Sequence, residues 1–325
     1  MTRSVIEMRA VGKRFGKLAA LKEIDFTLAE GEVVGMMGHN GAGKSTSMKV
    51  ILGLIRPTSG QVSVFGHDPA GAEANQLRLR LGYLPENVQF YEQLTGFEVL
   101  SYFARLKRIG NKVVAPLLER VGLAPAMHRQ VKTYSKGMRQ RLGLAQALIG
   151  EPRLMLFDEP TVGLDPMATR DFYSMVDELR GRGVSVILCS HVLPGVERHI
   201  DRAVILGQGK MLASGTIDEL RHSAKLPLVM RLRTSRSPDA LAAALRGYGA
   251  VAGEARNGRV ELQMPVAAKI PVLRLLMADS EVVDLDMEPP TLESLYAHFD
   301  GMIRESAGVE SAVSATARAT QGEPA

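Results

Sequence analysis

The sequence of 325 residues has a single cysteine and no long apolar run, and its first residues do not include the apolar block of a secretory signal. Because Cys189 is alone and lies in the apolar stretch VSVILC, we expect a buried structural thiol and no intramolecular disulfide. No uninterrupted apolar stretch approaches the roughly 18 residues that a membrane helix needs. The N-terminal segment alternates charged and apolar residues, unlike a signal peptide. These absences predict a cytoplasmic chain that does not itself span a membrane.

The sequence also lacks a block of like charge and a metal-binding pattern. Its 40 basic residues are scattered among 35 acidic ones, which gives a net charge of +5. A basic arm typical of nucleic-acid binding is therefore missing, and we expect no nucleic-acid partner. There is no C-x-x-C pair and no spaced histidine cluster that would predict a copper site in this chain.

Alternating strand and helix patterns predict the fold class. Valine- and isoleucine-rich stretches at 32–37, 154–157 and 184–189 are each followed by turn residues or charge, which is typical of buried parallel strands. Between the strands lie helical patterns, and the strand signal disappears from 87 to 134. We predict an α/β fold with a mostly parallel sheet and a helical subdomain at about 87–150.

The composition changes after about residue 222. We predict a first domain over 1–222 and a small α+β domain over 223–300. In the second domain the patterns run strand (228–232), helix (238–245), two strands (250–252 and 260–264), helix (266–278) and strand (282–287), which matches a ferredoxin-like unit. A short helix at 291–299 would close it. The tail at 301–325 has few large apolar side chains, and we expect it to be disordered.

A phosphate-binding loop follows the first predicted strand. The string GHNGAGKST, Gly38–Thr46, is flanked by a strand and a helix, as such a loop requires. Its glycines let successive N–H groups point at a phosphate, and the helix dipole points to the same place. Lys44 would bridge the outer phosphates of ATP, and the Ser45 hydroxyl would ligate Mg²⁺. A glycine turn without this function would need neither the lysine nor the hydroxyl.

Two acidic residues follow a second predicted strand. The run LMLFDEP places Asp158 and Glu159 at the carboxyl end of the strand, where ligands of open α/β sheets bind. Asp158 would hold Mg²⁺ through water, and Glu159 would act as the general base for the attacking water. Alone the pair could be a polar strand end, but the phosphate loop favours the catalytic interpretation.

With these motifs, residues 5–222 resemble the nucleotide-binding domains of ABC transporters, which implies a P-loop NTPase fold. YSKGMRQR, from Tyr134, is similar to the family's LSGGQ signature: Ser135 and Gly137 match it, whereas Lys136 and Met138 depart from it. Ser135 is also the predicted N-cap of a helix, so its hydroxyl and the nearby N–H groups could bind an anion. The resemblance implies that this helix meets the γ-phosphate of ATP held by a second copy of the chain.

The same resemblance assigns further residues. GLDP resembles the D-loop, with Asp165 facing the partner site, and His191 resembles the switch histidine, which joins Glu159 as a catalytic residue. Phe15 matches the aromatic residue that stacks on adenine. Glu86 stands where the family usually has the Q-loop glutamine, as a third Mg²⁺ ligand beside Ser45 and Asp158. The implied nucleotide-binding residues are Phe15, Gly38, His39, Asn40, Gly41, Ala42, Gly43, Lys44, Ser45, Thr46, Ser135, Gly137 and Asp165.

Longer strings narrow the resemblance. GHNGAGKSTSMK, GYLPENVQFY, YSKGMRQRLGLAQALIGEP and ILCSHVLPGVERHIDR are similar to the ATPase subunits of Nos transporters, which are linked to copper-site assembly in nitrous oxide reductase. This resemblance implies a homodimer on the inner face of the cell membrane, a NosY-like membrane permease and a NosD-like periplasmic partner. The alternatives are the ATPase of a general drug or lipid exporter and a soluble ABC ATPase without a membrane partner. A P-loop GTPase would need a guanine-binding N/T-K-x-D element, which we do not find beside these motifs.

Overall fold

The computed structural model describes residues 3–190, 195–256 and 258–302. The chain divides into two compact units, 1–214 and 215–325, so the boundary lies before the predicted position at 222. Residues 301 and 302 continue a helix, and the rest of the predicted tail lies outside the described residues, as does His191.

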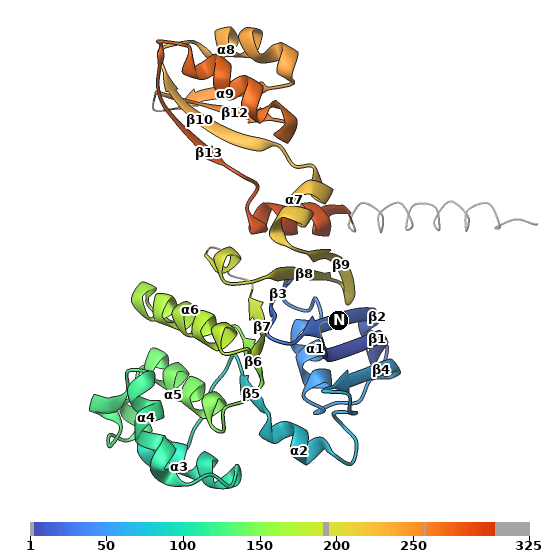
Figure 1. Ribbon diagram of the computed structural model, residues 1–325, viewed down its shortest axis with the longest axis vertical. Helices are drawn as coiled ribbons and strands as arrows, with labels where there is room; N and C mark the ends of the chain where they lie inside the picture. The colour runs from blue at the N-terminus through green and yellow to red at the C-terminus, as the bar shows by residue number, and fades with distance from the viewer. Residues whose placement is uncertain (1–2, 191–194, 257, 303–325) are drawn as a thin grey trace, which may run out of the picture. The chain divides into compact units, whose positions relative to one another are not determined.

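A six-stranded sheet forms the centre of the first unit (Figure 1), with the strand order β5-β6-β7-β3-β8-β9. The β5–β6, β6–β7, β7–β3 and β3–β8 pairs are parallel, which confirms the predicted sheet. β3, β6 and β7 are buried along their whole length, as their apolar sequences predict. The strands are β3 (Val33–Met37), β5 (Leu81–Leu84), β6 (Leu154–Asp158), β7 (Ser185–Ser190), β8 (Arg202–Gly207) and β9 (Lys210–Gly215).

A second, antiparallel sheet was not predicted from the sequence. Its order is β2-β1-β4, with β1 (Ser4–Phe15), β2 (Leu18–Ala29) and β4 (Ser59–Val64). The helix α1 (Lys44–Ile51) contacts both β2 and β4. Fully buried side chains from both sheets and α1 form one apolar core, which includes Ile6, Leu28, Met48 and Leu156. The loop that precedes α1 is therefore held by both sheets.

The predicted helical insertion is confirmed. It contains α3 (Gly96–Leu106), α4 (Val114–Arg120) and α5 (Lys136–Leu148), which contact one another. α3 begins with a capping box, in which the Thr95 side chain accepts from the Glu98 N–H and the Glu98 side chain accepts from the Thr95 N–H. The other helices of this unit are α2 (Ala74–Leu79) and α6 (Pro166–Gly181), together with short 3-10 turns at 111–113, 124–126, 131–133 and 196–198.

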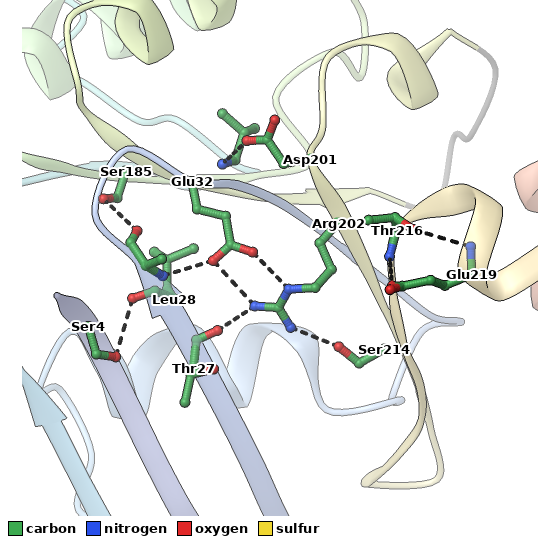
Figure 2. A network of polar contacts seen from close by, with 12 residues as sticks. Ser4, Thr27, Leu28, Glu32, Ser185, Asp201, Arg202, Ser214, Thr216 and Glu219 are labelled. Carbon is green, nitrogen blue, oxygen red and sulfur yellow. Dashed lines mark hydrogen bonds and ion pairs between the residues drawn. The ribbon is translucent and has the colours of Figure 1, made fainter. Parts of the chain in front are cut away.

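An arginine network joins the start of β8 to the turn before β3 (Figure 2). Arg202 donates through Nε to Glu32 Oε1 at 2.7 Å and through a terminal nitrogen to the Thr27 carbonyl at 2.6 Å. Its other terminal nitrogen donates to Ser214 Oγ at 2.8 Å. Glu32 also accepts the backbone N–H of Ala29 at 2.8 Å. Most of the hydrogen-bond donors and acceptors in this network are thus satisfied.

The second unit begins with α7 (Ile217–Ala224) and has the predicted order of elements: β10 (Leu228–Thr234), α8 (Pro238–Leu245), β11 (Val251–Arg256), β12 (Arg259–Met264), α9 (Lys269–Met277) and β13 (Val282–Glu288). The strands form an antiparallel sheet with the order β11-β12-β10-β13, as in a ferredoxin-like unit. Both helices contribute to one apolar core with the strands, through Leu241, Leu245, Val272 and Leu276. Residues 292–302 form a final helix.

Candidate nucleotide site

The predicted phosphate loop joins the carboxyl end of β3 to α1, and its glycines are required by its geometry. Gly43 has a φ of 114°, a conformation that residues with a Cβ rarely adopt. A Cβ on Gly38 would lie 2.6 Å from the Leu206 carbonyl oxygen, so the loop also packs closely against β8. Lys44 Nζ donates to the Gly38 carbonyl at 2.5 Å. The Lys44 ammonium is therefore held against the backbone at the start of the loop.

Two carboxylates at the end of β6 lie next to this cation. Asp158 and Glu159 are each only 5% exposed, and Glu159 Oε1 lies 3.8 Å from Lys44 Nζ. Burial raises the pKa of Asp158, a hydrogen bond with Ser45 opposes the rise, and the nearby charges of Glu159 and Glu86 raise the pKa further. Three carboxylates thus share the neighbourhood of one buried lysine.

Glu159 has a strained backbone. Its φ is +50°, in the left-handed region that costs a residue with a Cβ roughly 1–2 kcal/mol. Its N–H donates to the Cys189 carbonyl of β7 at 2.9 Å, which fixes the backbone at the edge of the sheet. Strain of this kind collects at functional sites, where the surrounding structure imposes it. Cys189 itself is fully buried, as predicted, and burial raises the pKa of its thiol.

A cavity of about 400 Å³ opens above these groups, within the size range of small-molecule sites. It brings together eleven predicted residues from β1, the phosphate loop, the segment after β5 and the end of β6. They are Phe15, His39, Asn40, Gly41, Gly43, Lys44, Ser45, Thr46, Glu86, Asp158 and Glu159. Phe15 is 48% exposed, and Lys13 Nζ lies over its ring at 5.1 Å from the centroid.

Other lining residues were not predicted. Leu18, Ala19, Ala20 and Lys22 come from the β1–β2 hairpin, and Gln208 comes from the turn between β8 and β9. No short motif marks these positions, because the fold alone brings them to the loop. Gly38 and Ala42, by contrast, belong to the loop but do not line the cavity; Ala42 is fully buried beneath it.

Besides Gly38 and Ala42, three predicted residues that the structure describes lie outside the cavity. Ser135 is the N-cap of α5, where its Oγ accepts the Met138 N–H at 3.2 Å, and Asp165 is the N-cap of α6, where it accepts the Ala168 N–H at 2.8 Å. A Cβ on Gly137 would lie in ordinary van der Waals contact with the D-loop, 3.7 Å from the Gly163 carbonyl oxygen. These residues lie close together near the starts of the two helices, and none of them lines the cavity of its own chain.

Among the residues that the structure describes, no helix combines the length and apolar character needed to cross a bilayer.

The comparisons with known proteins identify the family. A family model described as ABC transporter matches residues 21–162. The daunorubicin resistance ATP-binding protein DrrA3 of Streptomyces coeruleorubidus is 34% identical over 313 residues, covering 93% of this chain and 97% of that protein. The linearmycin resistance ATP-binding protein LnrL of Bacillus subtilis (strain 168) is 31% identical over 308 residues, covering 91% and 98%.

Solved structures agree with this assignment. An ATP binding subunit of an ABC transporter has a TM-score of 0.63 and 32% identity, over 67% of this chain and 92% of that chain. A dimeric bacterial ABC transporter cassette has a TM-score of 0.61 and 25% identity, over 65% and 98%. The chain therefore belongs to the ABC transporter family and is one of its ATP-binding, ATP-hydrolysing subunits.

Proposed function

We propose that the chain is a motor in which two copies enclose ATP and drive a membrane permease. The observation that carries this proposal is the separation of Ser135 from the cavity. Lys44, Asp158 and Glu159 converge in one cavity, whereas the exposed N-terminus of α5 lies outside it in the same chain. A helix N-terminus can stabilise a phosphate only at short range. A two-fold pairing of copies would bring Ser135 of each to the nucleotide of the other, as the family resemblance implies.

The cavity residues suit this chemistry. Phe15 would stack on adenine, and Lys44 would leave the Gly38 carbonyl to bridge the outer phosphates. The Ser45 hydroxyl, Asp158 and Glu86 offer oxygen donors that suit Mg²⁺. Among the described residues no three of His, Cys, Asp or Glu converge on one metal position, so a cation here would take phosphate oxygens among its ligands. When bound, Mg²⁺ would neutralise charge on the phosphates.

Glu159 is the proposed general base. Its carboxylate lies beside Lys44, directly after the carboxyl end of β6, and would accept a proton from the water that attacks the γ-phosphate. His191 is the proposed partner in placing that water, on the family resemblance. ATP binding would draw the two copies together, because the γ-phosphate contacts both, and hydrolysis would let them part. The residues after β5, with Glu86, are the proposed route from this movement to the permease.

For the transporter, we propose a NosF-type motor that supports copper-site assembly of nitrous oxide reductase, with NosY-like and NosD-like partners. The support is residue-level: Glu86 in GYLPEN and the KGM variant of the signature both occur in the long strings that resemble Nos ATPases. The alternative is a drug-exporter motor, which the full-length likeness to DrrA3 and LnrL favours. In either case we place the chain at the cytoplasmic face of the cell membrane.

Mixing two inactive variants tests the shared site. Ser135→Arg should leave ATP binding to one copy intact while obstructing the pairing of copies. Lys44→Ala should weaken ATP binding, because it removes the cation of the loop. In a mixed dimer one site carries both defects and the other carries neither, so we expect partial recovery of ATPase activity. Full activity of dilute monomeric Ser135→Arg, with no gain on mixing, would show that each copy hydrolyses ATP alone.

Deletion of the gene in its host separates the two transporter proposals. A NosF-type role predicts that nitrous oxide reductase loses copper, and that wild-type protein but not Glu159→Gln restores it. An exporter role predicts lower tolerance to exported drugs with unchanged reductase. If the chain has the NosF-type role, purification of the wild-type protein from detergent-treated membranes should also recover a NosY-like permease.

A further inference from the structure

The two-residue turn between β8 and β9 is fixed against the nucleotide cavity. The Gly209 N–H donates to the Ala42 carbonyl of the phosphate loop at 3.1 Å, and the Gly209 carbonyl accepts the Lys22 N–H at 2.7 Å. A Cβ on Gly209 would lie 2.8 Å from the Ala20 carbonyl oxygen. The turn is therefore held between the phosphate loop and β2, and it has little freedom to move relative to either.

The turn places an unusual residue at the cavity. Gln208 and Gly209 have φ values of +50° and +80°, so both adopt the left-handed conformation of a tight hairpin turn. Glycine, asparagine and aspartate are the usual residues at the first position, and a glutamine there is strained. Of the non-glycine residues with positive φ in the described part of the chain, Gln208 and the proposed base Glu159 are the two that line the cavity.

The Gln208 side chain is available for a ligand. It is exposed, it lines the cavity, and it makes no hydrogen bond to any residue that the structure describes. The Gly209 contact with Ala20 places the turn against the hairpin that carries Phe15 and Leu18, the largest apolar side chains of the cavity lining. The neighbouring Lys22 offers only donors, whereas the carboxamide of Gln208 offers a donor and an acceptor in one plane.

We propose that Gln208 recognises adenine in bound ATP, accepting from the 6-amino group and donating to N7. A glutamine carboxamide matches this edge, whereas guanine presents two acceptors, O6 and N7, at the same positions. Stacking on Phe15 alone would not distinguish the purines, because both have an aromatic face. Gln208 would thus be a specificity-determining residue of the site. The inference rests on the proposed ATP site and adds the base selection that the motifs do not supply.

Binding of 7-deaza-ATP, which lacks the N7 acceptor, provides the test. Equilibrium titration of the full chain should show that the wild type binds ATP about fivefold more tightly than 7-deaza-ATP, the effect of one exposed hydrogen bond. Gln208→Ala should bind both nucleotides equally, and its preference for ATP over GTP should fall by a similar factor. Gln208→Gly, which removes the backbone strain as well as the amide, should behave like Gln208→Ala.

Lys210→Ala is the matched control, because Lys210 is exposed in the same hairpin and does not line the cavity. It should keep the wild-type preference for ATP. Equal preference for ATP over 7-deaza-ATP in the wild type and in both Gln208 variants would overturn this inference while leaving the ATP site intact. Failure of the wild type to bind any of the three nucleotides would instead overturn the proposed function on which the inference rests.

Discussion

The two edges of the parallel sheet, at the amino and carboxyl ends of its strands, handle buried and half-buried charge in opposite ways. At the amino end, Glu32 meets Arg202 at 2.7 Å, and Asp201 accepts the Val33 N–H at 2.8 Å. At the carboxyl end, Asp158 and Glu159 lie 5% exposed beside a single buried cation, Lys44. The first end matches each carboxylate with donors, whereas the second crowds carboxylates together.

This difference indicates that the paired carboxylates contribute to stability and that the crowded carboxylates contribute to function. Carboxylates that are paired and hydrogen-bonded in the folded state stabilise it, because their charged form is favoured there. Carboxylates crowded in a cavity cost free energy in the empty protein, and a bound cation and nucleotide can offset that cost. Each end can therefore be changed separately, and the two changes should have different consequences for turnover and for the free energy of unfolding.

The largest expected effect is on turnover at the carboxyl end. Glu159→Gln removes the proposed general base while keeping the size of the side chain, so ATP hydrolysis should fall by about 10² to 10⁴. ATP binding should persist, and the pair of copies should stay closed around it. Steady-state ATPase assays and size-exclusion chromatography with ATP would measure both effects, while the free energy of unfolding should not fall.

Glu151→Gln is the matched control for this change. Glu151 also has a left-handed backbone, with a φ of +49°, but its side chain is 88% exposed and does not line the cavity. The same chemical change there should leave hydrolysis at the wild-type rate. Near-normal hydrolysis by Glu159→Gln would remove Glu159 from the proposed mechanism.

The charged groups at the carboxyl edge of the sheet were predictable from the sequence because short motifs contain them. Gly38–Thr46 and the acidic pair after β6 are short, and each is flanked by the apolar strand that positions it. The antiparallel sheet was missed because β1 does not alternate: Val5 and Ile6 are both buried, and register shifts interrupt its pairing with β2.

Long-range contacts account for the other omissions. Gln208 reaches the cavity only because β8 pairs with β3 and the following turn packs on the phosphate loop. Arg202 and Glu32 are separated by 170 positions, so nothing local indicates their ion pair. The predicted boundary at 222 differs from the observed one because α7 (Ile217–Ala224) belongs to the second unit, although it precedes the change in composition on which the prediction rested.

The second expected effect is on stability at the amino end. Arg202→Ala leaves the Glu32 carboxylate, only 17% exposed in its side chain, without its cation, and it also removes the donors to Thr27 and Ser214. Loss of one partner from a half-buried charged pair should lower the free energy of unfolding by about 2–3 kcal/mol. Urea unfolding of the full chain would measure it, and ATP turnover per folded molecule should change little.

Arg153→Ala gives the comparison with an exposed pair. Arg153 pairs with Glu30, but the two side chains are 50% and 40% exposed, so its removal should cost less than about 1 kcal/mol. Equal losses in Arg202→Ala and Arg153→Ala would mean that the network in Figure 2 contributes no more than an ordinary surface ion pair.

The smallest expected effect concerns Asp158, where removal of a charge should stabilise the protein. Its pKa is raised in the folded state, mainly by burial, from an ordinary value of 3.8. The folded protein therefore holds this proton to a higher pH than the unfolded chain does, and stability is lost as the pH rises from 3.8 through the folded-state pKa. Asp158→Asn retains an oxygen that can accept from Ser45 but cannot ionise. At pH 7 the free energy of unfolding of Asp158→Asn should exceed that of the wild type by less than about 1 kcal/mol. This difference in free energy should vanish near pH 4. Asp201→Asn, at the amino edge of the sheet, should be less stable than the wild type, because that carboxylate accepts from the Val33 N–H and pairs with Arg180. Urea unfolding of the three proteins between pH 4 and pH 8 would measure these free energies. A loss of stability in Asp158→Asn at pH 7 would contradict the inference that the crowded carboxylates at the carboxyl edge of the sheet destabilise the protein.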